Sequence, residues 1–148
     1  MPTPPIKKFK LGTVLKVYDG DTITVLYRKQ EYTLRICQID APELRQPFGP
    51  ESRDALSLLL LNQKVYFYLM TKDKYGRYVS EIKFNRKLIH RWLISEGLAQ
   101  VYSLYCTDKY LYKLETKAKK LKKGLWIQDA IEAPWVFRRR IKEKNEQP

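Results

Sequence analysis

The stretch KVYDGDTITVLY, residues 16–27, decides how the first part of the chain folds. It contains an Asp-Gly pair between two runs rich in β-branched and aromatic residues, which is the strongest short-range signal for a β-hairpin. Asp21 follows the glycine and is in phase with Ile23 and Val25, so strand alternation predicts its carboxylate on their apolar face. Because an unpaired charge is costly to bury, we expect this carboxylate to have a binding partner.

The hairpin is the first of several strand and helix patterns along the chain. Strand patterns, with β-rich composition, cover residues 11–17, 21–27, 31–39, 64–70 and 77–84. Helix patterns cover residues 51–61, 87–98 and 107–124. This order predicts a mainly β fold with an α cap (α+β): a five-stranded OB-fold Greek-key barrel with three helices. An α+β sandwich is the alternative.

The same patterns divide the chain into three parts. Residues 1–10 are interpreted as a flexible N-terminal arm rich in proline and lysine, and residues 11–127 as the barrel domain. Residues 128–148 form a C-terminal extension, whose aromatic start could pack back on the domain and whose polar end we expect to be disordered.

The charge of the chain points to a polyanionic partner. The 148 residues include 29 Lys and Arg against 16 Asp and Glu, a net charge of +13, which favours nucleic acid. A membrane surface is the competing interpretation, but no basic amphipathic helix supports it. Neither a membrane span nor a secretory signal is expected from the sequence as written, and localisation is otherwise left open. Cys37 and Cys106 match no metal or redox spacing and are interpreted as free thiols.

Charged residues at the end of the second hairpin, between the predicted strands 21–27 and 31–39, are the candidate site residues. A turn centred near Lys29 predicts Asp21 opposite Cys37 and Arg35 opposite Ile23, all on one face. Asp40 lies just past the end of the returning strand, at the same end of the sheet as Asp21. The sequence therefore predicts two carboxylates and a guanidinium close together.

Two partners could stabilise these carboxylates. A divalent cation would relieve both their burial and their mutual repulsion, and carboxylate, carbonyl and water ligands suit Ca²⁺ or Mg²⁺ rather than zinc. Alternatively, Asp21 and Asp40 pair with Arg35 in a buried salt-bridge cluster. Asp19 could join the metal site or simply form the turn.

Two further residues, Glu43 and Arg77, together with Arg35 make phosphodiester hydrolysis the chemistry that we expect. Glu43 supplies another carboxylate, which could orient or deprotonate a water, while Arg35 and Arg77 could bind the charge growing on the phosphoryl oxygens. Each residue taken alone has an ordinary explanation, such as a solvated turn or a loop charge. The combination of metal carboxylates, a base and two arginines is what favours a nuclease.

Six motifs carry a resemblance to a known family. They are VYDGDT, LRICQIDAPE, QPFGPES, DKYGR, EGLAQV and AKKLKKGLW, in that order between about residues 11 and 127. Together they resemble the staphylococcal-nuclease-like (thermonuclease) family. The resemblance implies an OB-type barrel and a Ca²⁺-dependent nuclease that cleaves DNA and RNA at the P–O5′ bond, leaving 3′-phosphate ends. Family members are often secreted.

The resemblance also implies roles for individual residues. Asp21, Asp40 and the Ala41 carbonyl would bind one Ca²⁺ or another divalent ion, with Asp19 acting through water in the outer shell. Glu43 would activate or orient the attacking water, and Arg35 and Arg77 would clamp the phosphate. The implied substrate-binding residues are Lys72, Lys74, Tyr75 and Tyr105.

The sequence departs from the family pattern in two places. Ser103 stands where the best-known member has a base-stacking tyrosine, and the segment after Glu43 is shorter than in that member. The main rival function is a catalytically inactive OB-fold module that only binds nucleic acid, and a basic structural or membrane-surface protein is a second. We expect a monomer, with DNA and RNA as partners, no membrane association and no protein partner.

Overall fold

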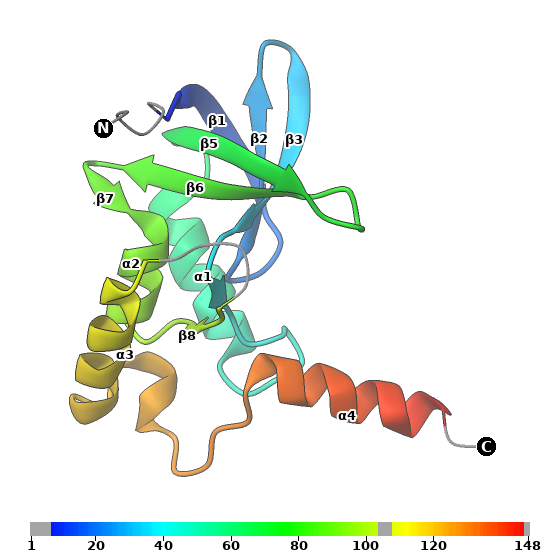
Figure 1. The fold of residues 1–148 in the computed structure, drawn as a ribbon, viewed down its shortest axis with the longest axis vertical. Helices are drawn as coiled ribbons and strands as arrows, with labels where there is room; N and C mark the ends of the chain where they lie inside the picture. The colour runs from blue at the N-terminus through cyan, green and yellow to red at the C-terminus, as the bar shows by residue number, and fades with distance from the viewer. Residues whose placement is uncertain (1–6, 104–107, 147–148) are drawn as a thin grey trace, which may run out of the picture.

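The structure, a computed structural model, describes residues 7–103 and 108–146, and its centre is a closed barrel (Figure 1). Five strands run in the order β3-β2-β1-β5-β6, and a parallel pairing of β3 with β6 closes the ring. The barrel strands are β1 (Lys10–Val17), β2 (Thr22–Tyr27), β3 (Gln30–Ile36), β5 (Lys64–Lys72) and β6 (Tyr78–Phe84). The predicted mainly β barrel with an α cap is confirmed.

Short strands connect the barrel to the rest of the chain. They are β4 (Ile39–Asp40), β7 (Lys87–Leu88) and β8 (Gln100–Val101). The predicted strand 31–39 is broken before β4, since Gln38 has a positive φ of 64°. The chain therefore leaves the barrel, and β4 pairs with β8 instead, which brings Asp40 to the mouth of the barrel. Cys37, at this break, is disulfide-bonded, so its interpretation as a free thiol is wrong; Cys106 lies outside the described residues.

The register of the second hairpin, formed by β2 and β3, differs from the prediction by one residue. The turn contains only Arg28 and Lys29, both with positive φ, as a type I′ turn requires, whereas the prediction assumed a three-residue turn. Arg35 consequently pairs with Thr22 and lies on the face of the sheet opposite to Ile23. Its predicted position on the apolar face is wrong, although it still reaches the end of the barrel where the aspartates lie.

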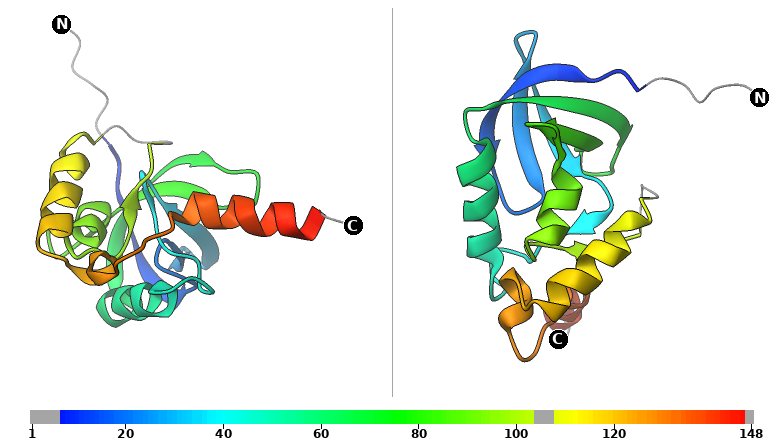
Figure 2. Two further views of the ribbon diagram at one scale, coloured as in Figure 1. Left: turned by 90° about the horizontal axis from the view of Figure 1, so that it is seen from below. Right: turned by 90° about the vertical axis from the view of Figure 1, so that its left-hand side faces the viewer.

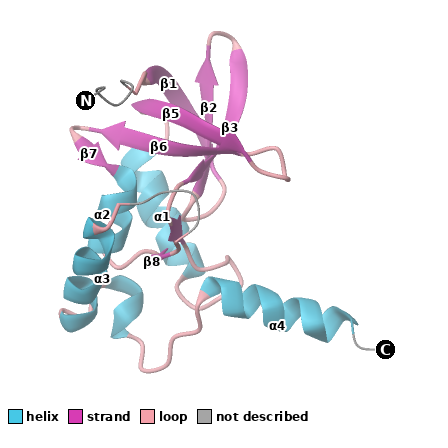
Figure 3. Cartoon of the chain, in the orientation of Figure 1, coloured by secondary structure: helices cyan, strands magenta, loops and turns pink. Residues whose placement is uncertain are grey.

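The helices lie toward one end of the barrel, and α4 runs outward from there (Figure 3). They are α1 (Gly49–Leu60), α2 (Ile89–Ser95), α3 (Tyr110–Lys120), the 3₁₀-helix η1 (Gly124–Ile127) and α4 (Pro134–Glu146). The first three correspond to the predicted helices. Leu56 and Leu60 of α1 are fully buried against a core that includes Ile23, Leu34 and Phe67. Within the described ranges, no helix is long and apolar enough to cross a membrane.

Helix α4 is an element that the sequence pattern did not predict. It lies in the C-terminal extension and continues to Glu146, further than the polar composition indicated. Its buried residues, Pro134 and Phe137, lie in its first turns, and its later turns project outward (Figure 2). The helix therefore presents its first turns to the mouth of the barrel.

Candidate active site

Three aspartates meet where the β1–β2 turn approaches strand β4. The turn can come this close because it contains Gly20: a Cβ at that position would lie 2.7 Å from the Ala41 Cβ and 3.0 Å from the Ser52 Cβ. Asp19 and Asp21 flank the glycine, and Asp40 precedes Ala41. A close approach of backbones thus brings carboxylates from distant parts of the chain to one place.

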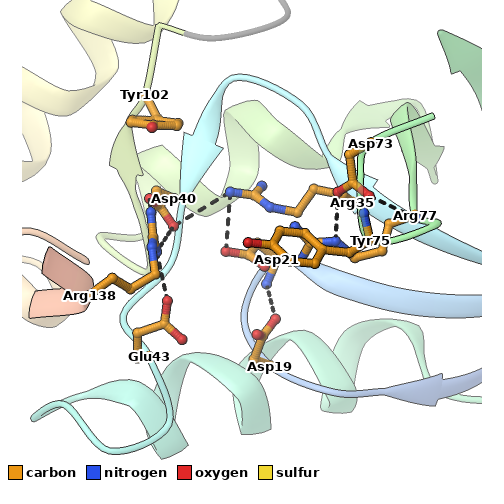
Figure 4. A pocket seen from close by; sticks show the side chains of 10 residues that line it. All are labelled: Asp19, Asp21, Arg35, Asp40, Glu43, Asp73, Tyr75, Arg77, Tyr102 and Arg138. Carbon is orange, nitrogen blue, oxygen red and sulfur yellow. Dashed lines mark hydrogen bonds and ion pairs between the residues drawn. The ribbon is translucent and has the colours of Figure 1, made fainter. Parts of the chain in front are cut away.

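A cavity of about 480 Å³ opens beside these aspartates (Figure 4). Its walls combine carboxylates, arginines and tyrosines in a small space. They come from Asp19, Asp21, Arg35, Asp40, Glu43, Asp73, Tyr75, Arg77, Tyr102 and Arg138. All the carboxylates and arginines that the sequence singled out as catalytic or metal-binding therefore line one cavity, with two further charged residues that it did not.

The carboxylate of Asp21 is held firmly from two sides. Its Oδ1 accepts a hydrogen bond from the Thr22 hydroxyl at 2.9 Å, and its Oδ2 accepts one from the backbone N–H of Ala41 at 3.1 Å. Burial opposes its ionisation, but the charge of Arg35 and these hydrogen bonds outweigh that effect, so the pKa of Asp21 lies below its usual value. Asp21 is therefore a fixed negative charge in a buried setting.

The fold stabilises the ionised forms of the neighbouring Asp19 and Asp40 less well. Burial, followed by the charge of Asp21, raises the pKa of Asp19 from 3.8 to about 7. Burial also raises the pKa of Asp40, which is 1% exposed, in spite of the arginines beside it. The cavity is lined by five carboxylates and three arginines, an imbalance of charge that a bound cation would reduce.

Arg35 lies between two of the aspartates. Its Nη1 donates to the carbonyl oxygens of Ile36 and Ile39 at 2.6 and 2.9 Å, which fixes the guanidinium plane. Its Nη2 is 3.6 Å from Asp21 and 3.5 Å from Asp40. An internal ion-pair cluster is thus present, but its distances are long, and the shorter contacts of Arg35 are made to carbonyl groups.

The loop after β4 holds Glu43 at the edge of the cavity. The Glu43 N–H donates to the Gln46 side chain at 2.9 Å, and its carbonyl accepts from the Gln46 N–H at 2.9 Å. Gly49 packs so closely on the Glu43 carbonyl that any side chain there would clash with it. The shortened loop therefore fixes the backbone of Glu43, while the side chain stays 32% exposed to the cavity.

Arg77 enters the cavity from the β5–β6 turn, and Asp73 orients it. The Asp73 carboxylate accepts from Arg77 Nε at 2.8 Å and from the backbone N–H groups of Tyr75 and Arg77 at 2.9 Å. These bonds outweigh its burial and hold the pKa of Asp73 below its usual value. Asp73 is a site residue that sequence reasoning missed, although an Asp at the start of a turn is typical of this kind of hydrogen bonding.

Arg138 of α4 is the second missed residue. Its Nη2 donates to Asp40 Oδ2 at 2.6 Å, and its Nη1 donates to Asp40 Oδ1 at 3.1 Å and to Glu43 Oε1 at 2.6 Å. The bonds to Asp40 raise the pKa of the Arg138 guanidinium above its already high value. The aromatic residues before the RRR run were the available signal, since they indicated a segment that packs back.

The predicted substrate-binding residues are distributed around the cavity. Tyr75 lines it and is 72% exposed, with the Lys74 ammonium 5.2 Å from its ring centre. Lys72 is exposed outside the cavity, 5.4 Å from the ring centre of Tyr78. Tyr105 lies outside the described residues.

Tyr102, which is half-buried, also lines the cavity and stacks on Trp135 of α4 at 5.3 Å between ring centres. Ser103, which replaces a tyrosine of the family pattern, is exposed.

The donor set is suited to a hard cation. Asp21 and Asp40 offer carboxylate oxygens, and none of the described residues that line the cavity is a cysteine or a histidine. In the part of the chain that the structure describes, no three His, Cys, Asp or Glu side chains form a complete metal cluster. Two direct carboxylates, with carbonyl and water ligands completing the shell, are the arrangement that these residues can provide.

Comparison with known proteins identifies the family. The model of the family described as staphylococcal nuclease homologue matches residues 33–128. The chain belongs to the staphylococcal nuclease family. A micrococcal nuclease of Shigella flexneri is 33% identical over 142 residues, covering 88% of this chain and 82% of its own length. An uncharacterized endonuclease of Escherichia coli O157:H7 is 33% identical over 130 residues, with 87% and 85% covered.

Plant relatives are similar over less of this chain and over a smaller share of their own length. A probable staphylococcal-like nuclease of Oryza sativa subsp. japonica is 38% identical over 115 residues, covering 78% of this chain and 30% of the plant protein. The family match ends at residue 128, before helix α4 begins. In this staphylococcal nuclease homologue, Arg138 therefore reaches the site from outside the region matched by the family model.

Proposed function

We propose that this protein is a Ca²⁺-dependent nuclease that hydrolyses DNA and RNA at the P–O5′ bond and leaves 3′-phosphate ends. Its family and its nuclease-named relatives support phosphodiester hydrolysis and a nucleic acid substrate. The observation that carries the proposal is that Arg35 and Arg77 line the same cavity as Asp21, Asp40 and Glu43. A protein that only binds nucleic acid gains nothing from carboxylates that repel phosphate.

The residues divide into those that hold the cation and those that act on the phosphate. Asp21, Asp40 and the Ala41 carbonyl would hold Ca²⁺, with Asp19 acting through a water. When bound, the cation supplies charge neutralisation for the phosphate and a coordinated, more acidic water. The raised pKa of Asp19, a consequence first of burial and then of the charge of Asp21, is consistent with a site that gains from an added positive charge.

Three residues would act on the phosphate and the attacking water. Glu43, held by its loop with its carboxylate toward the cavity, would orient the water or accept its proton. Arg35 and Arg77 would donate to the phosphoryl oxygens, whose charge grows in the transition state. Both guanidiniums are already oriented, by backbone carbonyls in one case and by Asp73 in the other, which reduces the cost of ordering them during the reaction.

Single-stranded segments suit the surroundings of the cavity. The exposed ring of Tyr75 can stack on a base, and Lys72 and Lys74 can contact the backbone on the same side. Since stacking and phosphate contact do not depend on base identity, we expect little sequence preference.

One observation favours the inactive binding module as the second candidate. Arg138 satisfies Asp40 and Glu43 inside the protein, as expected if these carboxylates had become structural. A cleavage assay separates the two functions: plasmid and heat-denatured DNA should be degraded in millimolar Ca²⁺ and spared by a chelator. Intact substrate, with the protein shown to be folded and bound to DNA, would establish the binding module instead.

A further inference from the structure

The contacts of Arg138 are all directed at the proposed cation site. Its guanidinium bridges both oxygens of Asp40 and one oxygen of Glu43, with two of the three distances at 2.6 Å. Asp40 is 1% exposed, whereas the Arg138 side chain is 42% exposed. A partly exposed arginine thus supplies the closest positive charge to a buried carboxylate.

A guanidinium in this position opposes a cation at the same carboxylate. Both Asp40 oxygens already accept hydrogen bonds from Arg138, so an ion bound by Asp40 would lie close to the Arg138 guanidinium and compete with it for the same two oxygens. The two positive charges also repel each other strongly in a site with little water. Glu43 Oε1 also accepts a hydrogen bond from Arg138, and this charged donor makes the carboxylate a weaker acceptor for the proton of an attacking water.

Helix α4 is attached in a way that allows Arg138 to leave. Residues 128–133, which connect it to η1, contain no helix or strand. Its contacts with the body include the buried Pro134 and Phe137, the stack of Trp135 on Tyr102, and Arg138 itself, and Arg140 pairs with Glu132 of the connecting segment. Beyond Arg138 the side chains of the helix are mostly exposed, and the helix runs outward from the site (Figure 1).

We propose that α4 is an autoinhibitory arm, in which Arg138 takes the place of the cation against Asp40 and Glu43. Cation and arginine compete: binding of Ca²⁺ releases Arg138 and frees the Glu43 carboxylate. Without the ion, Arg138 neutralises the site and keeps its buried charge compatible with the fold. The inference rests on the proposed function, because it needs a cation at Asp40.

The competition predicts that removing the guanidinium strengthens cation binding. In the full chain, Arg138→Gln should bind Ca²⁺ at least tenfold more tightly than the unmodified protein, measured by titration calorimetry without nucleic acid. Arg139→Gln is the matched control, since it removes the same charge from the next, exposed position of α4, and it should change the affinity less than twofold. Asp40→Asn should abolish binding and so assign the measured heat to this site.

Hydrogen exchange tests the movement of the arm independently. Since an isolated helix of 13 residues is marginal in water, Ca²⁺ should accelerate amide exchange across 134–146 in the unmodified protein. Arg138→Gln should show fast exchange without the ion, and a melting curve would establish that this variant is folded.

The outcomes separate this inference from the proposed function. Equal or weaker Ca²⁺ affinity of Arg138→Gln, with DNA still cleaved in Ca²⁺, would overturn only the autoinhibitory arm. Neither Ca²⁺ binding nor cleavage by either protein would overturn the proposed function and the arm together. Tighter Ca²⁺ binding by Arg138→Gln, without a similar change in Arg139→Gln, supports the autoinhibitory arm.

Discussion

Arg35 lies between Asp21 and Asp40, with its Nη2 3.6 Å from one carboxylate and 3.5 Å from the other. Its other terminal nitrogen, Nη1, donates hydrogen bonds to the carbonyl oxygens of Ile36 and Ile39. One terminal nitrogen of the guanidinium therefore binds the backbone, and the other faces the aspartates of the site. Substitutions at this position should affect both stability and catalysis, and the two effects can be measured separately.

Arg35→Gly should lower the cleavage rate by at least about 10²-fold, because it removes a donor to the phosphoryl oxygens. It should also lower the free energy of unfolding, since two carbonyl groups lose a charged donor. Kinetics at saturating Ca²⁺ and urea unfolding measure the two effects. Arg53→Gly, at a more exposed arginine paired with Asp54, is the control and should leave the rate unchanged. A normal rate for Arg35→Gly would remove Arg35 from the catalytic set.

Glu43→Ser should reduce the rate by about 10²-fold or more while preserving the fold. The side chain is 32% exposed, and the loop is held through the Glu43 backbone, so the substitution leaves the Gln46 and Gly49 contacts in place. Single-turnover cleavage and a thermal melt provide the measurements. Glu51→Ser, in the exposed first turn of α1, is a matched control. Equal activity of Glu43→Ser and Glu51→Ser would contradict a role in activating water.

Asp73→Asn should affect both the orientation of Arg77 and the response of stability to pH. The folded pKa of Asp73 lies below its ordinary value of 3.8, so its ionised form contributes stability above that pH, and this contribution is lost as pH falls through the folded pKa. The difference in unfolding free energy between the parent and Asp73→Asn should therefore be largest near neutral pH and shrink toward pH 2. Denaturant unfolding across this range measures it.

The same variant separates positioning from chemistry. Arg77→Gly should cost at least about 10² in rate, while Asp73→Asn should cost less, because the guanidinium remains but is less well oriented. The double variant should be no slower than Arg77→Gly, since Asp73 acts through Arg77. Additive losses in the double variant would show that Asp73 acts on the substrate by another route.

Local pattern was sufficient for the barrel but not for the register of its second hairpin, β2–β3. Alternation and composition located the barrel strands because each buries one face on a common core. The face of Arg35 depended on whether the turn used two residues or three, and a one-residue difference moves every side chain to the other face. The sequence also did not reveal the break in the strand at Gln38, because Gln is an unusual residue at a positive φ.

In the site as well, residues of one hairpin could be placed from the sequence, whereas a residue far away in the chain could not. The sequence predicted that Asp21 and Asp40 lie close together, because both lie at the same end of the β2–β3 hairpin. Arg138 could not, because it is 98 residues from Asp40 in sequence and its approach depends on the packing of Pro134 and Phe137. Asp73 was overlooked because its importance lies in holding Arg77, a relation that composition does not reveal.

Calcium should raise the melting temperature if the ion binds where Asp21 and Asp40 meet. A ligand that binds only the folded state stabilises it by about 2.7 kcal/mol at one hundred times its dissociation constant. Asp21→Asn should abolish this shift, since Asp21 is the carboxylate whose pKa is lowered and which stays ionised. Asp54→Asn, on the exposed side of α1, should retain it. Scanning calorimetry with Ca²⁺ and with chelator measures both, and an equal shift in Asp21→Asn would place the ion elsewhere.

Gly20→Ala should disturb the site through the backbone. The added Cβ would lie 2.7 Å from the Ala41 Cβ, so the β1–β2 turn must move away from Ala41 and carry Asp19 and Asp21 with it. Overpacking of this kind costs about 1–3 kcal/mol, and Ca²⁺ affinity should fall as well because the carboxylates separate. Gly12→Ala is the control: its Cβ would lie 2.9 Å from the Phe67 ring, so it should destabilise the barrel without moving the aspartates. If Gly20→Ala loses stability but binds Ca²⁺ as tightly as Gly12→Ala does, the approach of the turn to Ala41 is needed only for folding.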